Sequence, residues 1–134
     1  SERSIAQIFS EVMGQSNPQR KRRETRELFN ELLEKNQIEQ ALEFAKMIPD
    51  PLTRSFVLEK ISHSFANQRE IDSALQIAEM IVYPMQRSHA IKYISHLLLI
   101  EQKTNHAFKI AKNIPNPLIR SFAMRDISEV LTED

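Results

Sequence analysis

Apolar side chains recur at intervals of three and four residues along nearly the whole chain, which is the spacing of one face of an α-helix. In the first such stretch they are Ile5, Ile8, Phe9 and Val12. No stretch alternates apolar and polar residues as a half-buried strand does, so we expect an all-α fold. The pattern, with the prolines and polar turns that interrupt it, predicts eight helices over residues 4–13, 18–35, 37–48, 51–66, 70–81, 84–101, 104–114 and 117–131.

One segment of this pattern occurs three times. The copies are ALEFAKMIPDPLTRSFVLEKIS, ALQIAEMIVYPMQRSHAIKYIS and AFKIAKNIPNPLIRSFAMRDIS, which start at residues 41, 74 and 107, so the period is 33 residues. One period further upstream, Pro51 corresponds to Pro18 and Ala41 to Ile8, so a weaker copy precedes them. A fixed period between about 20 and 50 residues is typical of stacked repeats.

The repeat predicts how the chain is organised. We expect one domain over residues 1–134, with a leading helix (2–14), repeats at 18–48, 51–81 and 84–114, and a closing helix (117–131). A single two-helix unit cannot bury its apolar face alone, so neighbouring units must stack. Short connections make successive helices antiparallel neighbours. The expected architecture is therefore a right-handed α-solenoid of antiparallel helix hairpins.

Composition restricts the chemistry that this fold can support. The single glycine argues against phosphate-binding loops and dinucleotide turns, which need several. Equal numbers of basic and acidic residues, 18 of each, disfavour nucleic acid and anionic membranes as partners. No apolar run approaches the length of a membrane span. The absence of cysteine and of a secretory signal pattern leads us to expect a cytoplasmic location.

The repeating unit has a defined set of large and small positions. In the second unit they are Leu58, Ile61, Ser62, Phe65, Ala74 and Ala78. This pattern resembles the tetratricopeptide repeat over residues 18–128, with Pro51, Pro84 and Pro117 at the position of the proline between that family's repeats. The chain departs from the family in its period, which is about 34 residues there, and in Phe29, which replaces a small residue. We therefore expect the first unit to pack differently.

The resemblance implies a concave groove lined by the first helix of each unit, where the family binds a peptide or another protein. Carried over position by position, the predicted partner-binding residues are Arg23, Arg26, Asn30, Glu59, His63, Asn67, His89, Lys92 and His96. Phe56 and Phe122 fall on the same face, but we expect them in the core. Arg26 with Asn30 resembles half of a carboxylate clamp, which Lys60 and Tyr93 do not complete. A solvated polar face is the alternative interpretation.

Basic residues form two further patterns. One arginine recurs in each unit, at Arg54, Arg87 and Arg120. These residues could form a ladder of guanidinium groups that binds an acidic ligand, but we favour a role in the packing between units. The segment 20–26 holds five basic residues at the start of a helix, where the macrodipole disfavours positive charge. It could bind an acidic partner or simply be solvated.

Nothing in the sequence indicates catalysis. The four histidines have no metal-ligand spacing, and no nucleophile–base motif is present. We expect a non-enzymatic protein-binding module without metal, cofactor or small-molecule substrate, with self-association through the array ends as a further possibility. Two alternatives stay open: RNA binding by a pentatricopeptide-like array, and a non-catalytic scaffold or chaperone segment of a larger protein. A chain that opens on Ser1 rather than methionine fits the second alternative.

Overall fold

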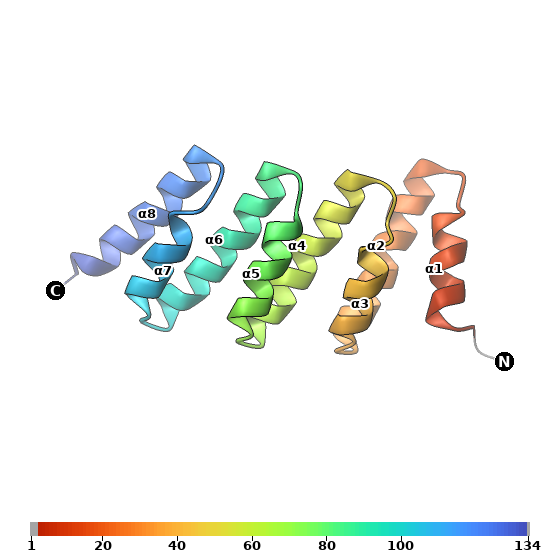
Figure 1. Ribbon diagram of the computed structural model, residues 1–134, viewed down its shortest axis with the longest axis horizontal. Helices are drawn as coiled ribbons and strands as arrows, with labels where there is room; N and C mark the ends of the chain where they lie inside the picture. The colour runs from red at the N-terminus through yellow and green to blue at the C-terminus, as the bar shows by residue number, and fades with distance from the viewer. Residues whose placement is uncertain (1–2, 134) are drawn as a thin grey trace.

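Eight α-helices follow one another in a row, and the two chain ends lie at opposite ends of that row in the computed structural model (Figure 1). They are α1 (Ile5–Met13), α2 (Pro18–Glu34), α3 (Ile38–Ala45), α4 (Pro51–Asn67), α5 (Ile71–Met80), α6 (Pro84–Ile100), α7 (Thr104–Ala111) and α8 (Pro117–Leu131). The structure describes residues 3–133, so residue 2 of the expected leading segment lies outside it. No strand occurs within that range, and the expected all-α fold with eight helices is confirmed.

The helix boundaries follow from local sequence. The helices α2, α4, α6 and α8 each begin with proline, whose missing N–H has no partner to lose in a first turn. Directly before three of these prolines, a side-chain oxygen caps the helix by accepting a backbone hydrogen bond: Asn17, Asp50 and Asn116. The helices α3 and α7 end at Ala45 and Ala111, earlier than the sequence predicts, because Ile48 and Ile114 precede prolines and are disfavoured in the helical conformation.

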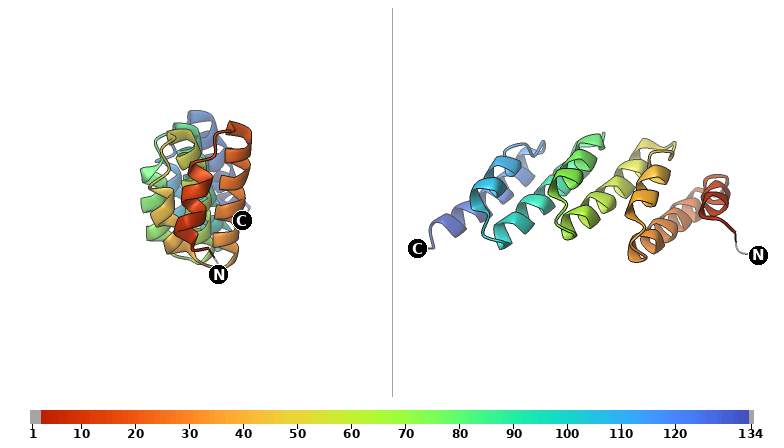
Figure 2. Two further views of the ribbon diagram at one scale, coloured as in Figure 1. Left: turned by 90° about the vertical axis from the view of Figure 1, so that its right-hand side faces the viewer. Right: turned by 60° about the horizontal axis from the view of Figure 1, so that its bottom comes forward.

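The helices form two layers. The longer helices α2, α4, α6 and α8 lie in one layer and the shorter α1, α3, α5 and α7 in the other (Figures 1 and 2). Each longer helix packs against its chain neighbours, and successive longer helices pack on one another, α2 on α4, α4 on α6 and α6 on α8. Within residues 3–133, no helix has the length and apolarity needed to cross a lipid bilayer.

Small residues allow the two layers to approach closely. Ala41, Ala74 and Ala107 are fully buried at equivalent positions of α3, α5 and α7. The buried hydroxyls of Ser62 and Ser95 donate to the carbonyl oxygens of Ala74 and Ala107 at 2.8 and 2.9 Å. A buried hydroxyl without a partner would be destabilising, and these bonds remove that cost. The recurring serine therefore serves the contact between the two helices of a unit.

The first unit replaces this serine with Phe29, which is fully buried. The Phe29 ring meets the ring of Phe9 edge-on, with 6.4 Å between their centroids. Phe9 in turn lies 5.0 Å from the ring of Phe44. Aromatic packing against α1 thus takes the place of the serine–carbonyl bond, and the first unit is packed differently, as the sequence predicts.

The last helix exposes an apolar side that its equivalents bury. Leu131 is 62 % exposed, whereas Phe65 and Leu98, at the same position of earlier units, are 6 % and 1 % exposed. Val130 beside it is 38 % exposed. Self-association through the array ends stays a prediction, and these two residues are the ones that such a contact would bury at α8.

A recurring arginine joins the helices α4, α6 and α8 to the segment that directly follows the preceding shorter helix. The guanidinium groups of Arg54, Arg87 and Arg120 donate to the carbonyl oxygen six residues earlier, at 2.7, 2.8 and 3.0 Å. Helix ends leave carbonyl groups without partners, and a cation near them is favourable. In all three cases the guanidinium group donates to a backbone carbonyl. This supports the interpretation that the arginine recurs for structural reasons, and it does not favour a ladder that binds an acidic ligand.

The turns inside the units share one backbone conformation. Asn36, Arg69 and Gln102, spaced by one period, have positive φ angles of 59°, 65° and 65°. The N–H after each of them donates to a carbonyl five residues earlier at 2.9 to 3.0 Å, which closes the helix end. Glycine is the residue best suited to this conformation, but none of the three turns uses it.

Replacement of Gln102 by glycine should therefore stabilise the protein. The expected gain in the free energy of unfolding is about 0.5–1 kcal/mol, because relief of the left-handed strain outweighs glycine's extra freedom in the unfolded chain. Urea unfolding measures this difference. Gln102→Ala is the matched control and should show no gain, since alanine keeps the strained Cβ. Equal stabilities of the two variants would contradict the argument.

Replacement of Arg87 by methionine should destabilise the protein by about 1–2 kcal/mol, because the Ile81 carbonyl loses a charged donor while the aliphatic stem is kept. Arg23→Met is the control, and we expect a change within about 0.5 kcal/mol for its exposed ion pair. Thermal and urea unfolding test both variants. A change at Arg87 no larger than that at Arg23 would remove the structural role assigned to the recurring arginine.

Candidate functional site

The helices α4 and α6 bring together five of the nine predicted partner-binding residues. A shallow pocket of about 400 Å³ lies between these helices. It is lined by Glu59, His63, His89, Lys92, Tyr93 and His96. Positions three and four residues apart lie on one face of a helix, which explains why the two sets meet across the α4–α6 contact.

The other four predicted residues lie outside this pocket: Arg23, Arg26, Asn30 and Asn67. Asn30 accepts a hydrogen bond at 3.0 Å from the Lys60 ammonium group, which joins α2 to α4. Asn67 accepts one from the Tyr93 hydroxyl, which joins α4 to α6. The two asparagine oxygens therefore serve contacts between successive longer helices.

Tyr93 is a site residue that sequence reasoning did not assign to the groove. Its ring stacks on the imidazole of His63, with 4.0 Å between centroids and 20° between planes. Tyr93 lies four residues after His89 and three before His96, so helical spacing alone could have placed it with them. The aromatic pair forms a flat surface inside the pocket.

Burial controls the charge states of two groups in this pocket. Desolvation raises the pKa of Glu59, and the nearby His89 and Lys60 act in the opposite direction. Desolvation also lowers the pKa of His63, and a charge on His89 lowers it further. The His63 Nε2 atom is buried without a hydrogen-bond partner among the described residues, 3.9 Å from a Glu59 carboxylate oxygen. Burial therefore disfavours the charged form of His63, although a backbone hydrogen bond to His89 acts in the opposite direction.

Phe56 and Phe122 are exposed, which corrects the expectation that they belong to the core. Their exposed fractions are 49 % and 39 %. Phe122 lies beneath two cations, with Lys92 Nζ 5.7 Å and the Arg125 guanidinium carbon 5.4 Å from its ring centroid. The physical reason for their exposure is the repeat position that they share. On the other two longer helices, the same position is occupied by Arg23 and His89, which are also exposed. That position faces solvent in every unit.

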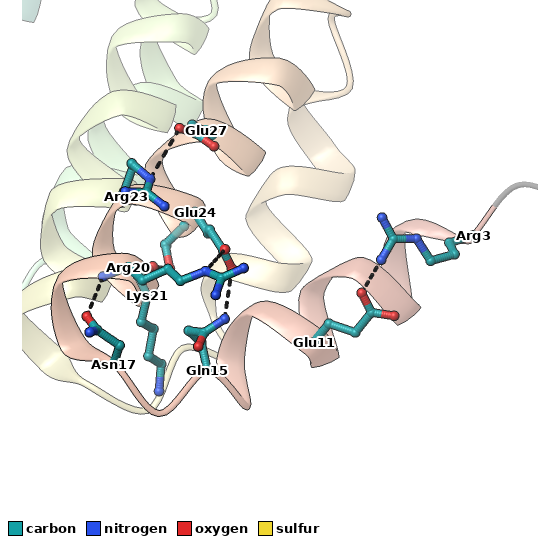
Figure 3. A network of polar contacts seen from close by, with 10 residues as sticks. Arg3, Glu11, Gln15, Asn17, Arg20, Lys21, Arg23, Glu24 and Glu27 are labelled. Carbon is teal, nitrogen blue, oxygen red and sulfur yellow. Dashed lines mark hydrogen bonds and ion pairs between the residues drawn. The ribbon is translucent and has the colours of Figure 1, made fainter.

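The basic segment at the start of α2 is partly neutralised (Figure 3). Arg20 pairs with Glu24 at 2.9 Å, and Arg23 pairs with Glu27 at 3.8 Å, both along the helix. Arg22 and Arg26 have no carboxylate partner within residues 3–133. The segment thus offers two unpaired guanidinium groups.

The described residues offer no metal-binding group: nowhere do three or more histidine, cysteine or carboxylate side chains converge on one point in residues 3–133. The pocket instead combines a flat aromatic surface, the ammonium group of Lys92 and imidazoles, which can both donate and accept hydrogen bonds. This arrangement suits recognition of a polar chain with apolar side chains.

Replacement of His63 by phenylalanine should reduce the loss of stability at acid pH. Because the folded pKa of His63 is lowered, its contribution to stability is complete above the ordinary histidine pKa of about 6.5 and is lost as pH falls through the lowered folded value. Phenylalanine preserves the stacking on Tyr93 and removes this proton. Unfolding free energies measured from about pH 7.5 to pH 5 should fall less steeply for His63→Phe than for the parent.

Glu59→Gln is the control, because the pKa of Glu59 is shifted in the opposite direction and its effect on the pH dependence of stability should have the opposite sign. Its raised folded pKa means that the stability it contributes is present at low pH and is lost as pH rises through that value. Parallel stability curves for the parent and His63→Phe would show that burial does not perturb this imidazole.

Comparison of the chain with protein-family models, with curated proteins and with solved structures gives no match. The tetratricopeptide resemblance therefore stays a prediction based on the residues that suggested it. The candidate site is defined by geometry alone: the shared outer face of α2, α4, α6 and α8, with its pocket between α4 and α6.

Proposed function

We propose that the protein is a non-catalytic, tetratricopeptide-like α-solenoid that binds a peptide or a segment of another protein along its four longer helices. The partner would lie across α2, α4, α6 and α8 and contact the side chains between them. The mechanism is presentation of a preformed surface, with no bond made or broken. We place the protein in the cytoplasm and propose no cofactor or small-molecule substrate.

One observation supports this function most directly. A single repeat position, occupied by Arg23, Phe56, His89 and Phe122, is exposed on all four longer helices. Two of these residues are phenylalanines, and large exposed apolar groups that recur on one face are typical of interaction surfaces. Because the four helices pack in succession, the position continues from one helix to the next.

The same hydrogen bonds, repeated one period apart, support the solenoid arrangement. The arginine–carbonyl bond occurs in three units and the serine–carbonyl bond in two. Identical contacts between equivalent helices favour a regular relation between units, since each unit meets only its neighbours. A rigid row of helices presents its surface at a low entropic cost of binding.

RNA binding is the second candidate, and the cations beside Phe122 favour it. An aromatic ring flanked by Lys92 and Arg125 could stack a base while the cations meet phosphates. The neutral net charge and the carboxylate of Glu59 in the central pocket favour the protein partner. A steep dependence of binding on salt would identify RNA.

Charge reversal across the groove tests the function. A photo-crosslinking residue at His96 should capture a partner in cell extract, whereas the same residue at Gln76 on α5 should not. The double variant Lys92→Glu/Arg125→Glu should reduce the captured amount about tenfold, since it removes both cations over Phe122. Quantitative mass spectrometry of the crosslinked products provides the measurement.

Lys109→Glu/Lys112→Glu is the matched control, with the same change in charge at the end of α7 in the other layer. Equal capture by both double variants, or equal capture from His96 and Gln76, would reject the groove. Capture that nuclease treatment abolishes would replace the protein partner with RNA.

A further inference from the structure

A pocket lies in the contact between α2 and α4. It has a volume of about 220 Å³, with an apolar floor and a basic rim. The floor includes Phe29, Phe56 and Val57, and the rim includes Arg22, Arg26 and Lys60. A second pocket of about 350 Å³ adjoins it and shares Arg22 and Phe56. The exposed Phe56 ring therefore lies between the two pockets.

Two departures from the repeat open this pocket. At the position of Arg22, the next two units have Ser55 and Ser88, which are 1 % and 0 % exposed. The Ser88 hydroxyl accepts a hydrogen bond at 2.9 Å from the backbone N–H of Asn116, directly before α8. An arginine cannot be buried in such a close contact, so Arg22 is exposed at the rim. The packing of α2 on α4 is correspondingly less extensive than that of α4 on α6.

Thr25 is the second departure. Its equivalents in the next two units are Leu58 and Ile91, which are 1 % and 5 % exposed and fill the space between successive longer helices. The smaller Thr25 is also buried, and its hydroxyl donates to the Lys21 carbonyl oxygen of its own helix. A position that holds a large aliphatic side chain elsewhere is therefore underfilled here.

The charge around the opening is positive, and its two guanidinium groups form no ion pair within residues 3–133. Arg22 and Arg26 have no carboxylate partner in the described residues, and Lys60 donates only to the neutral Asn30. The carboxylate in the adjoining pocket, Asp50, is already bonded to the N–H and hydroxyl of Thr53, which lower its pKa. Guanidinium groups pair with carboxylates in a forked geometry, so the complementary partner is acidic.

We propose that this pocket anchors one large apolar side chain of an acidic polypeptide segment, whose flanking carboxylates bind Arg22 and Arg26. The inference depends on the proposed protein-binding function and specifies what the α2 end of the groove recognises. The apolar floor supplies affinity by burying the anchor, and the basic rim selects an anchor with acidic neighbours. The size of the pocket suits a single side chain rather than a whole ligand.

Short synthetic peptides with aspartate and glutamate around a central Leu, Ile, Met, Phe or Trp provide the probe. Fluorescence anisotropy should show that at least one of them binds at least about tenfold more tightly than the same peptide with a central glycine. The variant Arg22→Ser/Thr25→Leu copies the residues of the later units and should close the pocket, which lowers that affinity about tenfold. Circular dichroism checks that the variant is folded.

Lys46→Ser is the matched control, because it also removes one positive charge, and the exposed Lys46 directly after α3 does not line the pocket. It should keep the affinity within about twofold. Arg26→Gln changes only the rim and should weaken binding of the acidic peptides without altering the pocket floor, which provides a test independent of refolding around residue 25.

Three results with the peptides would overturn the inference. They are the absence of binding by every acidic peptide, equal binding of the glycine peptide, or unchanged affinity in Arg22→Ser/Thr25→Leu. Tighter binding of poly(U) RNA at the same residues would overturn it in favour of nucleic acid. Failure of these peptides together with retained crosslinking at His96 would reject the anchor site alone, whereas loss of both would reject the proposed function.

Discussion

A buried serine hydroxyl that donates to a carbonyl oxygen of the facing helix is the contact on which the packing of the second and third units depends. Ser62 and Ser95 are small enough to let two helices meet closely, and their hydrogen bonds remove the cost of burying a polar group. Close approach in turn buries the fully enclosed Ile61 and Ile94 beside them. Apolar burial by neighbouring elements is the main source of stability in such an array, and it requires this small contact.

The candidate binding features occur where the repeat is least regular. Arg22, Thr25 and Phe29 replace the residues that close the contacts of the later units, and the pocket with the unpaired guanidinium groups lies among them. The repeated residues therefore form the packed scaffold, and the residues that depart from the repeat make the surface of the first unit different from that of the later units. A small loss of packing between α2 and α4 accompanies this difference, as is common when a surface serves binding as well as stability.

Aromatic rings and cations lie close together on the shared outer face of α2, α4, α6 and α8. Phe56 lies next to the basic rim, the stacked His63–Tyr93 pair forms the centre, and Phe122 lies beneath Lys92 and Arg125. Desolvation disfavours the charged form of His63 and favours the protonated form of Glu59 relative to a solvated carboxyl group. The surface can therefore bury apolar side chains while it pairs with acidic ones, a combination that fits a folded or extended polypeptide better than a uniformly charged polymer.

The sequence by itself determined the helices and their number, because apolar spacing and the prolines at Pro18, Pro51, Pro84 and Pro117 are local signals. It also singled out the small serine and alanine positions, which recur with the period and match small positions of the tetratricopeptide pattern. Only the tertiary structure decided which side chains on the outer face of the longer helices are exposed and which are hydrogen-bonded to a neighbouring helix. Asn30 and Asn67 bond across to the next helix, and Phe56 and Phe122 are exposed rather than buried. Periodicity defines the face of a helix, but the distance to the neighbouring helix depends on every residue between them, and that distance decides whether a side chain is buried, bonded or available to a partner.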